Sequence, residues 1–182
     1  MITTLNKIRA YEPCASGWQT LLTNLEKIRA DDEPLAITTI LDSNGLADAL
    51  WCLRAVEGRD REIRLFAVWC ARQVQHLMTD PRSLAALDVA ERFANGEAGD
   101  VELIAAREAA REAARAAGDA SGAAAWAARA AAWAAGDASW AAARAAGDAA
   151  WDAAWAAARA AVRKAQAARL REVCAEIERG KK

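Results

Sequence analysis

The stretch from Ala125 to Ala161 decides the fold class and reads AWAARAAAWAAGDASWAAARAAGDAAWDAAWAAARAA. It holds 23 alanines and five tryptophans in 37 residues, with no Leu, Ile, Val, Met or Phe. Alanine has the highest intrinsic helix propensity, so the stretch is predicted to be helical. Tryptophan is the only large apolar side chain available there, and its positions therefore decide what these helices can bury or bind.

The five tryptophans share one helix face, and we call them the tryptophan stripe. They follow one another at intervals of seven, seven, eleven and four residues: Trp126, Trp133, Trp140, Trp151 and Trp155. On an ideal helix these intervals keep all five within about 60° of one another. Arg144 falls on the same face, and Arg129 and Arg159 lie about 60° to either side of it. Randomly placed tryptophans would not stay in phase through three different intervals.

Three interpretations of the stripe stay open. It can supply the buried area of a region that has no other large residue. It can offer indole faces and guanidinium groups to a nucleotide-type ligand, which needs a flat platform and donors for phosphate. It can also anchor a protein partner, since Trp and Arg are common interface anchors. The candidate ligand-binding residues are Trp126, Arg129, Trp133, Trp140, Arg144, Trp151 and Trp155.

The rest of the chain also shows helical spacing, so we expect an all-α protein. Large apolar residues concentrate before Ala105, which predicts a helical-bundle head over residues 1–98. Residues 99–182 are predicted to form Ala/Trp-rich antiparallel helices that pack on the head, with a turn at residues 136–139. The expected helices of the head, read from caps and breakers, are 16–30, 34–41, 46–57, 60–78 and one that begins at Asp80-Pro81. Glu108, Arg111, Glu112 and Arg115 are spaced to stabilise a helix of their own through ion pairs.

Composition excludes several classes of function. The net charge is −1, from 24 basic and 25 acidic residues, which argues against general nucleic-acid binding. No apolar run reaches about 18 residues, so no membrane span is expected. The four cysteines form no CxxC pair and there is one histidine, so no metal site is expected, and Cys52 and Cys70 are predicted to be buried. The N-terminal residues lack the apolar core of a signal peptide, which predicts a cytoplasmic protein.

Catalytic signatures are missing from the sequence. No nucleophile, base and orienting group occur in a recognisable order, and there is no P-loop or dinucleotide-binding glycine motif. We therefore expect a binding protein that is not an enzyme and that needs no cofactor.

Several short motifs follow one another in a fixed order along the chain. DSNG at residues 42–45 precedes ALW at 49–51, and RLF at 64–66 precedes WCAR at 69–72. DPRS at 80–83 precedes AER at 90–92 and NGEA at 95–98, and the Ala/Trp-rich tail closes with QAARLRE at 166–172. In this order the motifs resemble an all-helical, alanine-rich immunity-protein family of bacteria and phages, and the resemblance spans about residues 35 to 175.

The resemblance implies a cytoplasmic protein of bacterial or phage conflict that neutralises a toxin or a defence protein by stoichiometric binding. One alternative is a phage anti-defence sponge, which sequesters a nucleotide-derived immune signal in a pocket lined by Trp and Arg. Another alternative is a scaffold that forms a homo-oligomer through its alanine faces. The sequence leaves all three open.

Overall fold

The computed structural model describes residues 1–118, 129–136 and 156–180 of the 182-residue chain. Its architecture is predominantly all-α, as expected, with one minor two-stranded sheet among the described residues. The chain divides into two compact units. The first comprises Met1–Arg59 with Ala167–Lys182, and the second comprises Asp60–Gln166. The division expected from composition, between residues 98 and 99, falls inside the second unit.

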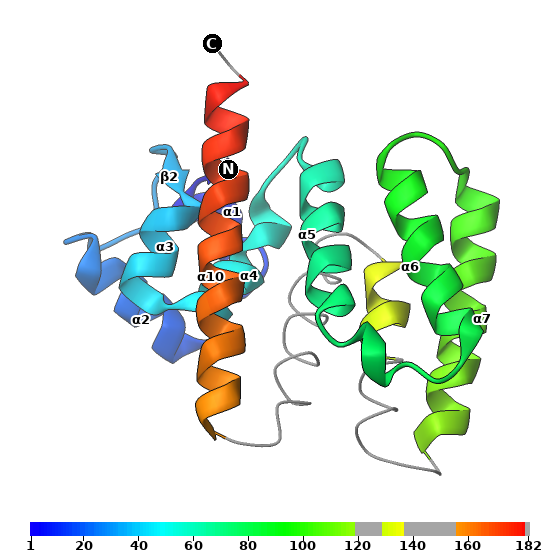
Figure 1. Cartoon of the computed structure of the whole chain (residues 1–182). Helices are drawn as coiled ribbons and strands as arrows, with labels where there is room; N and C mark the ends of the chain where they lie inside the picture. The colour runs from blue at the N-terminus through cyan, green and yellow to red at the C-terminus, as the bar shows by residue number, and fades with distance from the viewer. Residues whose placement is uncertain (119–128, 137–155, 181–182) are drawn as a thin grey trace. The chain divides into compact units, whose positions relative to one another are not determined.

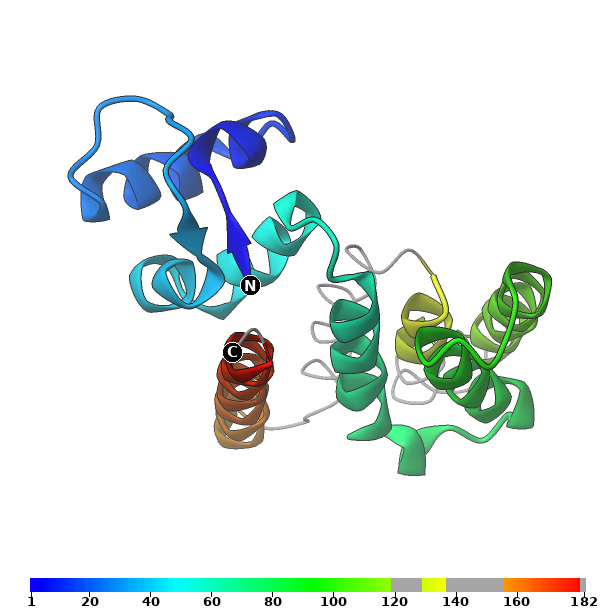
Figure 2. The ribbon, with the colours of Figure 1, turned by 90° about the horizontal axis from the view of Figure 1, so that it is seen from above.

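The first unit is built from short elements. In chain order they are β1 (Ile2–Thr3), α1 (Leu5–Arg9), α2 (Ala15–Asn24), β2 (Leu35–Ala36), α3 (Ile37–Asn44), α4 (Leu46–Cys52) and the 3-10 turn η1 (Leu53–Ala55). The two strands pair antiparallel, with Ile2 opposite Ala36, and lie side by side in Figure 2. α3 packs against both α2 and α4. The buried hydroxyl of Thr3 donates to the carbonyl of Ala55 at 2.5 Å, which ties the first strand to η1.

The C-terminal part of α10 (Ala156–Arg179) completes this unit. Its buried residues recur at helical spacing and form one apolar face: Leu170, Val173, Cys174 and Ile177. Arg171 adds an ion pair to Asp42 of α3, with 2.5 Å between Nη2 and Oδ1. Burial raises the pKa of the Cys174 thiol, although the nearby N-terminal ammonium opposes that shift.

Several expected boundaries in the first unit were wrong. Pro34 does not open a helix, because Leu35 and Ala36 pair with β1, and the helix begins at Ile37. Strands of two residues are too short to show the alternation that identifies a strand in a sequence. The same helix continues past Leu41 to Asn44 and ends at Gly45, whose φ of 84° suits glycine. The helix expected over 16–30 is α2, which covers Ala15–Asn24.

The second unit contains longer helices. They are α5 (Asp60–Arg72), the 3-10 turn η2 (Gln75–Leu77), α6 (Pro81–Ala94), α7 (Asp100–Gly118), helical residues 129–134 and the start of α10. α6 packs between α5 and α7 (Figure 1). Asp80 caps α6 as the sequence predicted, by accepting a hydrogen bond from the amide of Arg82 at 2.9 Å. Among the described helices, none is long and apolar enough to cross a membrane.

α5 ends earlier than expected, at Arg72 instead of Met78. The amides of Gln73 and Val74 bond three residues back, to Cys70 and Ala71, so the α-helical ladder is already lost there. Arg72 instead reaches α6, where its Nη2 lies 3.0 Å from Asp88 and 2.6 Å from Glu91. The predicted burial of Cys52 and Cys70 is confirmed, and burial raises the pKa of the Cys52 thiol to about 12.

Arg64 of α5 is buried inside the second unit, with 7 % of its surface exposed. Its Nη1 donates to the carbonyl oxygens of Ala134, at 3.4 Å, and Gly136. Its guanidinium carbon also lies 5.0 Å from the centroid of the Phe93 ring in α6. One side chain therefore connects α5, α6 and the C-terminal end of the 129–134 helix. A cation at a helix C-terminus is favourable, because the last carbonyls carry partial negative charge and lack intrahelical partners.

We expect Arg64→Met to lower the free energy of unfolding by about 2–4 kcal/mol, because it leaves buried carbonyls without a donor. Urea denaturation followed by circular dichroism measures this change. Arg61→Met is the matched control on the same helix, since Arg61 is exposed and its Nη2 donates to the side-chain oxygen of Asn95 at 2.9 Å. A loss of stability for Arg64→Met no larger than that of the control would contradict the structural role of Arg64.

Candidate anion-binding groove

A groove in the second unit brings together one tryptophan and three arginines. Arg111 and Arg115 come from α7, and Arg129 and Trp133 come from the helical segment 129–134. Ala114 and Ala132 line the groove between them, and its volume is about 240 Å³. We call this feature the Trp133 groove. Trp133 is half-buried and Arg129 is exposed, so the groove opens to solvent.

Alanine lets the two walls of the groove come close. Three alanines of α7 and four of the segment 129–136 are among the most buried residues of the unit: Ala110, Ala113, Ala114, Ala130, Ala131, Ala134 and Ala135. The separation of packed helices depends on the side chains at their contact, and a methyl group keeps it small. The arginines that flank these alanines on each wall are therefore held near one another without a large apolar residue between them.

Gly136 fixes where the second wall ends. Its amide donates to the carbonyl of Trp133 at 2.8 Å, and a Cβ on Gly136 would lie 3.1 Å from that same oxygen. Any larger residue would therefore crowd the backbone at this point. Arg64 holds the carbonyl of Gly136 from the other side. The position of the Trp133 backbone, and with it one wall of the groove, is thus set by a tight turn and a buried cation.

The two α7 arginines that line the groove already have partners on their own helix. Arg111 lies 2.8 Å from Glu108, and Arg115 pairs with Glu112. All four side chains are at least one third exposed, and exposed pairs of this kind contribute about 0–1 kcal/mol. An anionic ligand such as a phosphate can therefore replace the glutamates as partner of these guanidinium groups, at the small free-energy cost of two weak ion pairs. Neither glutamate is among the residues that line the groove.

The groove suits an anion that carries a flat ring. Guanidinium groups bind phosphate or carboxylate with two parallel hydrogen bonds, and an indole face stacks on an aromatic ring. Its described lining contains no carboxylate, so nothing there opposes a negative charge. It also contains no hydroxyl, thiol, imidazole or amine among the described residues, and these are the groups that serve as nucleophile or base.

The sequence-based candidates can be located only in part. Arg129 and Trp133 lie within the described residues, and the structure brings them into one groove. The other candidates, Trp126, Trp140, Arg144, Trp151 and Trp155, lie outside the described residues. Arg111 and Arg115 were not predicted to line a site, because their spacing from Glu108 and Glu112 explained them as helix-stabilising ion pairs. The available signal was that the two arginines lie four residues apart and so share a face.

No metal centre accompanies the groove in the part of the chain that the structure describes, where histidine, cysteine and carboxylate side chains form no cluster of three. Comparisons with protein-family models, with curated proteins and with solved structures gave no match to this chain. The resemblance to the immunity-protein family therefore stays a prediction from the sequence motifs.

We expect Ala113→Leu to lower the free energy of unfolding by about 1–3 kcal/mol, because Ala113 is 1 % exposed and three more carbons at a buried site force its neighbours to shift. Ala116→Leu is the matched control, since Ala116 is exposed on the same helix. Urea denaturation of both variants measures the difference. Equal stability of the two would mean that the alanines of α7 are not closely packed.

Proposed function

We propose that this protein is a non-enzymatic binding protein that sequesters a small, anionic and aromatic molecule of the nucleotide class. The observation that carries the proposal is the Trp133 groove, in which three arginines surround one indole and no described lining residue is acidic. An indole face and bidentate phosphate donors are the two features that a base with its phosphates requires.

Size and charge favour a small molecule over a nucleic acid. The groove volume of about 240 Å³ is below the usual range of ligand pockets, roughly 300–1,000 Å³, which favours a small ligand over a polymer. The whole chain carries a net charge of −1, whereas a protein that binds nucleic acid in general needs a positive excess. The positive charge is therefore local, which suits a ligand with a few phosphates.

The resemblance to the immunity-protein family supplies the biological setting of this proposal. A cytoplasmic phage protein that binds a nucleotide-derived immune signal one to one lowers the free concentration of that signal. Such a sponge needs no turnover, but it must bind more tightly than the effector that the signal activates. It must also reach a concentration comparable to that of the signal, since each copy removes one molecule.

The first test is native mass spectrometry of the protein purified gently from cells with an active nucleotide-signalling defence. We expect a mass excess of a few hundred daltons that disappears on denaturation, because a nucleotide-class ligand is held without a covalent bond. The bare mass of the chain from induced cells, with ADP also failing to bind in calorimetry, would contradict the proposal.

Variants then connect the ligand to the groove. We expect Arg111→Gln and Arg129→Gln each to weaken binding of ADP at least about tenfold, since each removes a charge-assisted contact to phosphate. Adenosine, which lacks phosphate, should bind weakly and equally to all variants. Arg61→Gln removes one exposed arginine from the same unit outside the groove and is the matched control. Unchanged ADP affinity in both groove variants, with the fold intact by circular dichroism, would exclude the groove as the site.

A second candidate function is immunity-type inhibition of a toxin or a defence protein. The exposed face of α7 favours it. Val101 is 83 % exposed and Ile104 is 58 % exposed, and the same face continues to Arg111 and Arg115. Exposed apolar residues beside arginines are typical of an interface between proteins.

The same native spectrum distinguishes this candidate, because inhibition by binding predicts a second polypeptide in place of a small molecule. We expect Val101→Ser with Ile104→Ser to weaken capture of that polypeptide at least about tenfold, since both side chains would be buried in the complex. Ile28→Ser is the control, because Ile28 is 97 % exposed in the first unit. Undiminished capture by the double variant would exclude this face of α7 as the interface.

A further inference from the structure

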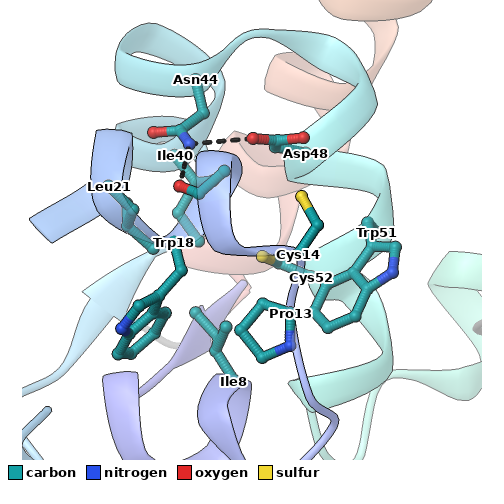
Figure 3. A pocket seen from close by; sticks show the side chains of 11 residues that line it. Ile8, Pro13, Cys14, Trp18, Leu21, Ile40, Asn44, Asp48, Trp51 and Cys52 are labelled. Carbon is teal, nitrogen blue, oxygen red and sulfur yellow. Dashed lines mark hydrogen bonds between the residues drawn. The ribbon is translucent and has the colours of Figure 1, made fainter.

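A separate pocket lies within the first unit, and the Trp133 groove does not account for it. Its volume is about 190 Å³. Residues from α1, α2, α3, α4 and the loop after α1 line it: Ile8, Pro13, Cys14, Gly17, Trp18, Leu21, Ile40, Asn44, Asp48, Trp51 and Cys52. We call it the Trp18–Trp51 pocket (Figure 3).

Two half-buried tryptophans form the sides of this pocket. In Figure 3, Trp18 and Trp51 lie on either side of Pro13 and Ile8. The inner wall is apolar, since Ile8, Leu21 and Ile40 are each at most 2 % exposed. Large aromatic rings that are left partly open beside a buried apolar wall can take up a small apolar body.

Of the described residues that line the pocket, one is charged, the carboxylate of Asp48. The amide of Asn44 donates both to Asp48 Oδ2 and to the carbonyl of Gly17, at 2.9 Å each, which fixes the carboxylate in place. Ser43 orients that amide in turn, because its hydroxyl donates to Asn44 Oδ1 at 2.9 Å. The hydrogen-bond partner of Asp48 among the described residues is thus a neutral amide, and no arginine or lysine lines the pocket.

This arrangement is complementary to a cation. A carboxylate beside apolar walls is unfavourable unless a positive charge or several donors compensate it. Indole faces also attract cations, and Trp51 already shows this, because the guanidinium carbon of Arg54 lies 4.1 Å from its ring centroid. A phosphate-bearing ligand is disfavoured here, since the one charge in the lining is negative.

We infer that the Trp18–Trp51 pocket is a second ligand site, which binds a small organic ammonium ion with an apolar body of about one ring. The ammonium group bonds Asp48, and the apolar body packs against the indole rings and the apolar wall. The volume of about 190 Å³ suits a ligand of this size. This site is independent of the proposed nucleotide binding, because its residues belong to the other unit and its charge has the opposite sign.

Three probes of similar shape and different charge test the inference by calorimetry: 2-phenylethylammonium, 2-phenylethanol and 3-phenylpropionate. We expect the ammonium ion to bind the full-length protein at least about tenfold more tightly than the alcohol, with 3-phenylpropionate the weakest of the three. Equal affinity for the ammonium ion and the alcohol, or no binding of the ammonium ion at millimolar concentration, would overturn the inference.

Asp48→Asn isolates the charge, because asparagine keeps an oxygen that can accept from Asn44. We expect this variant to lose the tenfold preference for the ammonium ion and to keep its affinity for the alcohol. Asp42→Asn makes the same change of charge on α3 outside the pocket and should leave the preference intact. A preference that survives in Asp48→Asn would overturn the role of the carboxylate.

Cys14 supplies a second readout that does not depend on a variant. Its thiol is exposed and lines the pocket, whereas Cys52, Cys70 and Cys174 are buried. Alkylation by iodoacetamide, followed by intact mass, should therefore modify one cysteine rapidly. We expect saturating 2-phenylethylammonium to slow this modification at least about threefold, with 3-phenylpropionate without effect. An unchanged rate at saturation would place the ammonium ion elsewhere and overturn the assignment.

Discussion

The second unit depends on one buried guanidinium group. Among the described residues Arg64 is the one charged side chain that is classed as buried, with 7 % of its surface exposed. A buried charge must find partners, and Arg64 finds them in the carbonyls of Ala134 and Gly136 and in the ring of Phe93. The two hydrogen bonds join segments that lie 70 and 72 residues apart in the sequence. This interaction, together with the burial of the alanines around it, places the wall of the Trp133 groove that carries Arg129.

That dependence follows from the use of alanine. A buried methyl group contributes little area, so a helix of alanines gains less from packing than one of leucines. It also gains little specificity, because alanine faces fit one another in many registers. Polar contacts of defined geometry can select one arrangement of the helices. Examples are the hydrogen bonds from Arg64 Nη1 to two carbonyls and the tight turn at Gly136. The alanines then form the closely packed helices, while tryptophan and arginine line the groove.

Much of the fold was predictable from local signals, and most of the groove was not. The cap at Asp80 and the start of α5 at Asp60 follow from short-range chemistry, and both are confirmed. Helical phase likewise placed Arg129 and Trp133 near one another, since both positions belong to one helix. In the sequence, Arg64 and Arg111 resemble ordinary surface residues. Periodicity shows which residues share a face of one helix, but it does not show which other helix packs against that face. The Trp18–Trp51 pocket was missed for the same reason, since five different segments line it.

The ion pairs on α7 connect the stability of the groove to its proposed use. Glu108 and Glu112 hold Arg111 and Arg115 along the helix while the groove is empty, so the guanidinium groups are partly ordered before a ligand arrives. An exposed pair of this kind is weak, and phosphate is a stronger partner than a solvated carboxylate. Replacing Glu108 and Glu112 by phosphate as the partners of the two arginines therefore costs little free energy, because both glutamates become solvated by water. The guanidinium groups that then bind the phosphate lose little further conformational freedom. Removing either glutamate would make the groove more positive, which favours binding of an anion. It would also remove an ion pair that stabilises α7 and orders the arginine. The same four side chains therefore determine both the affinity for an anion and the order of the helix.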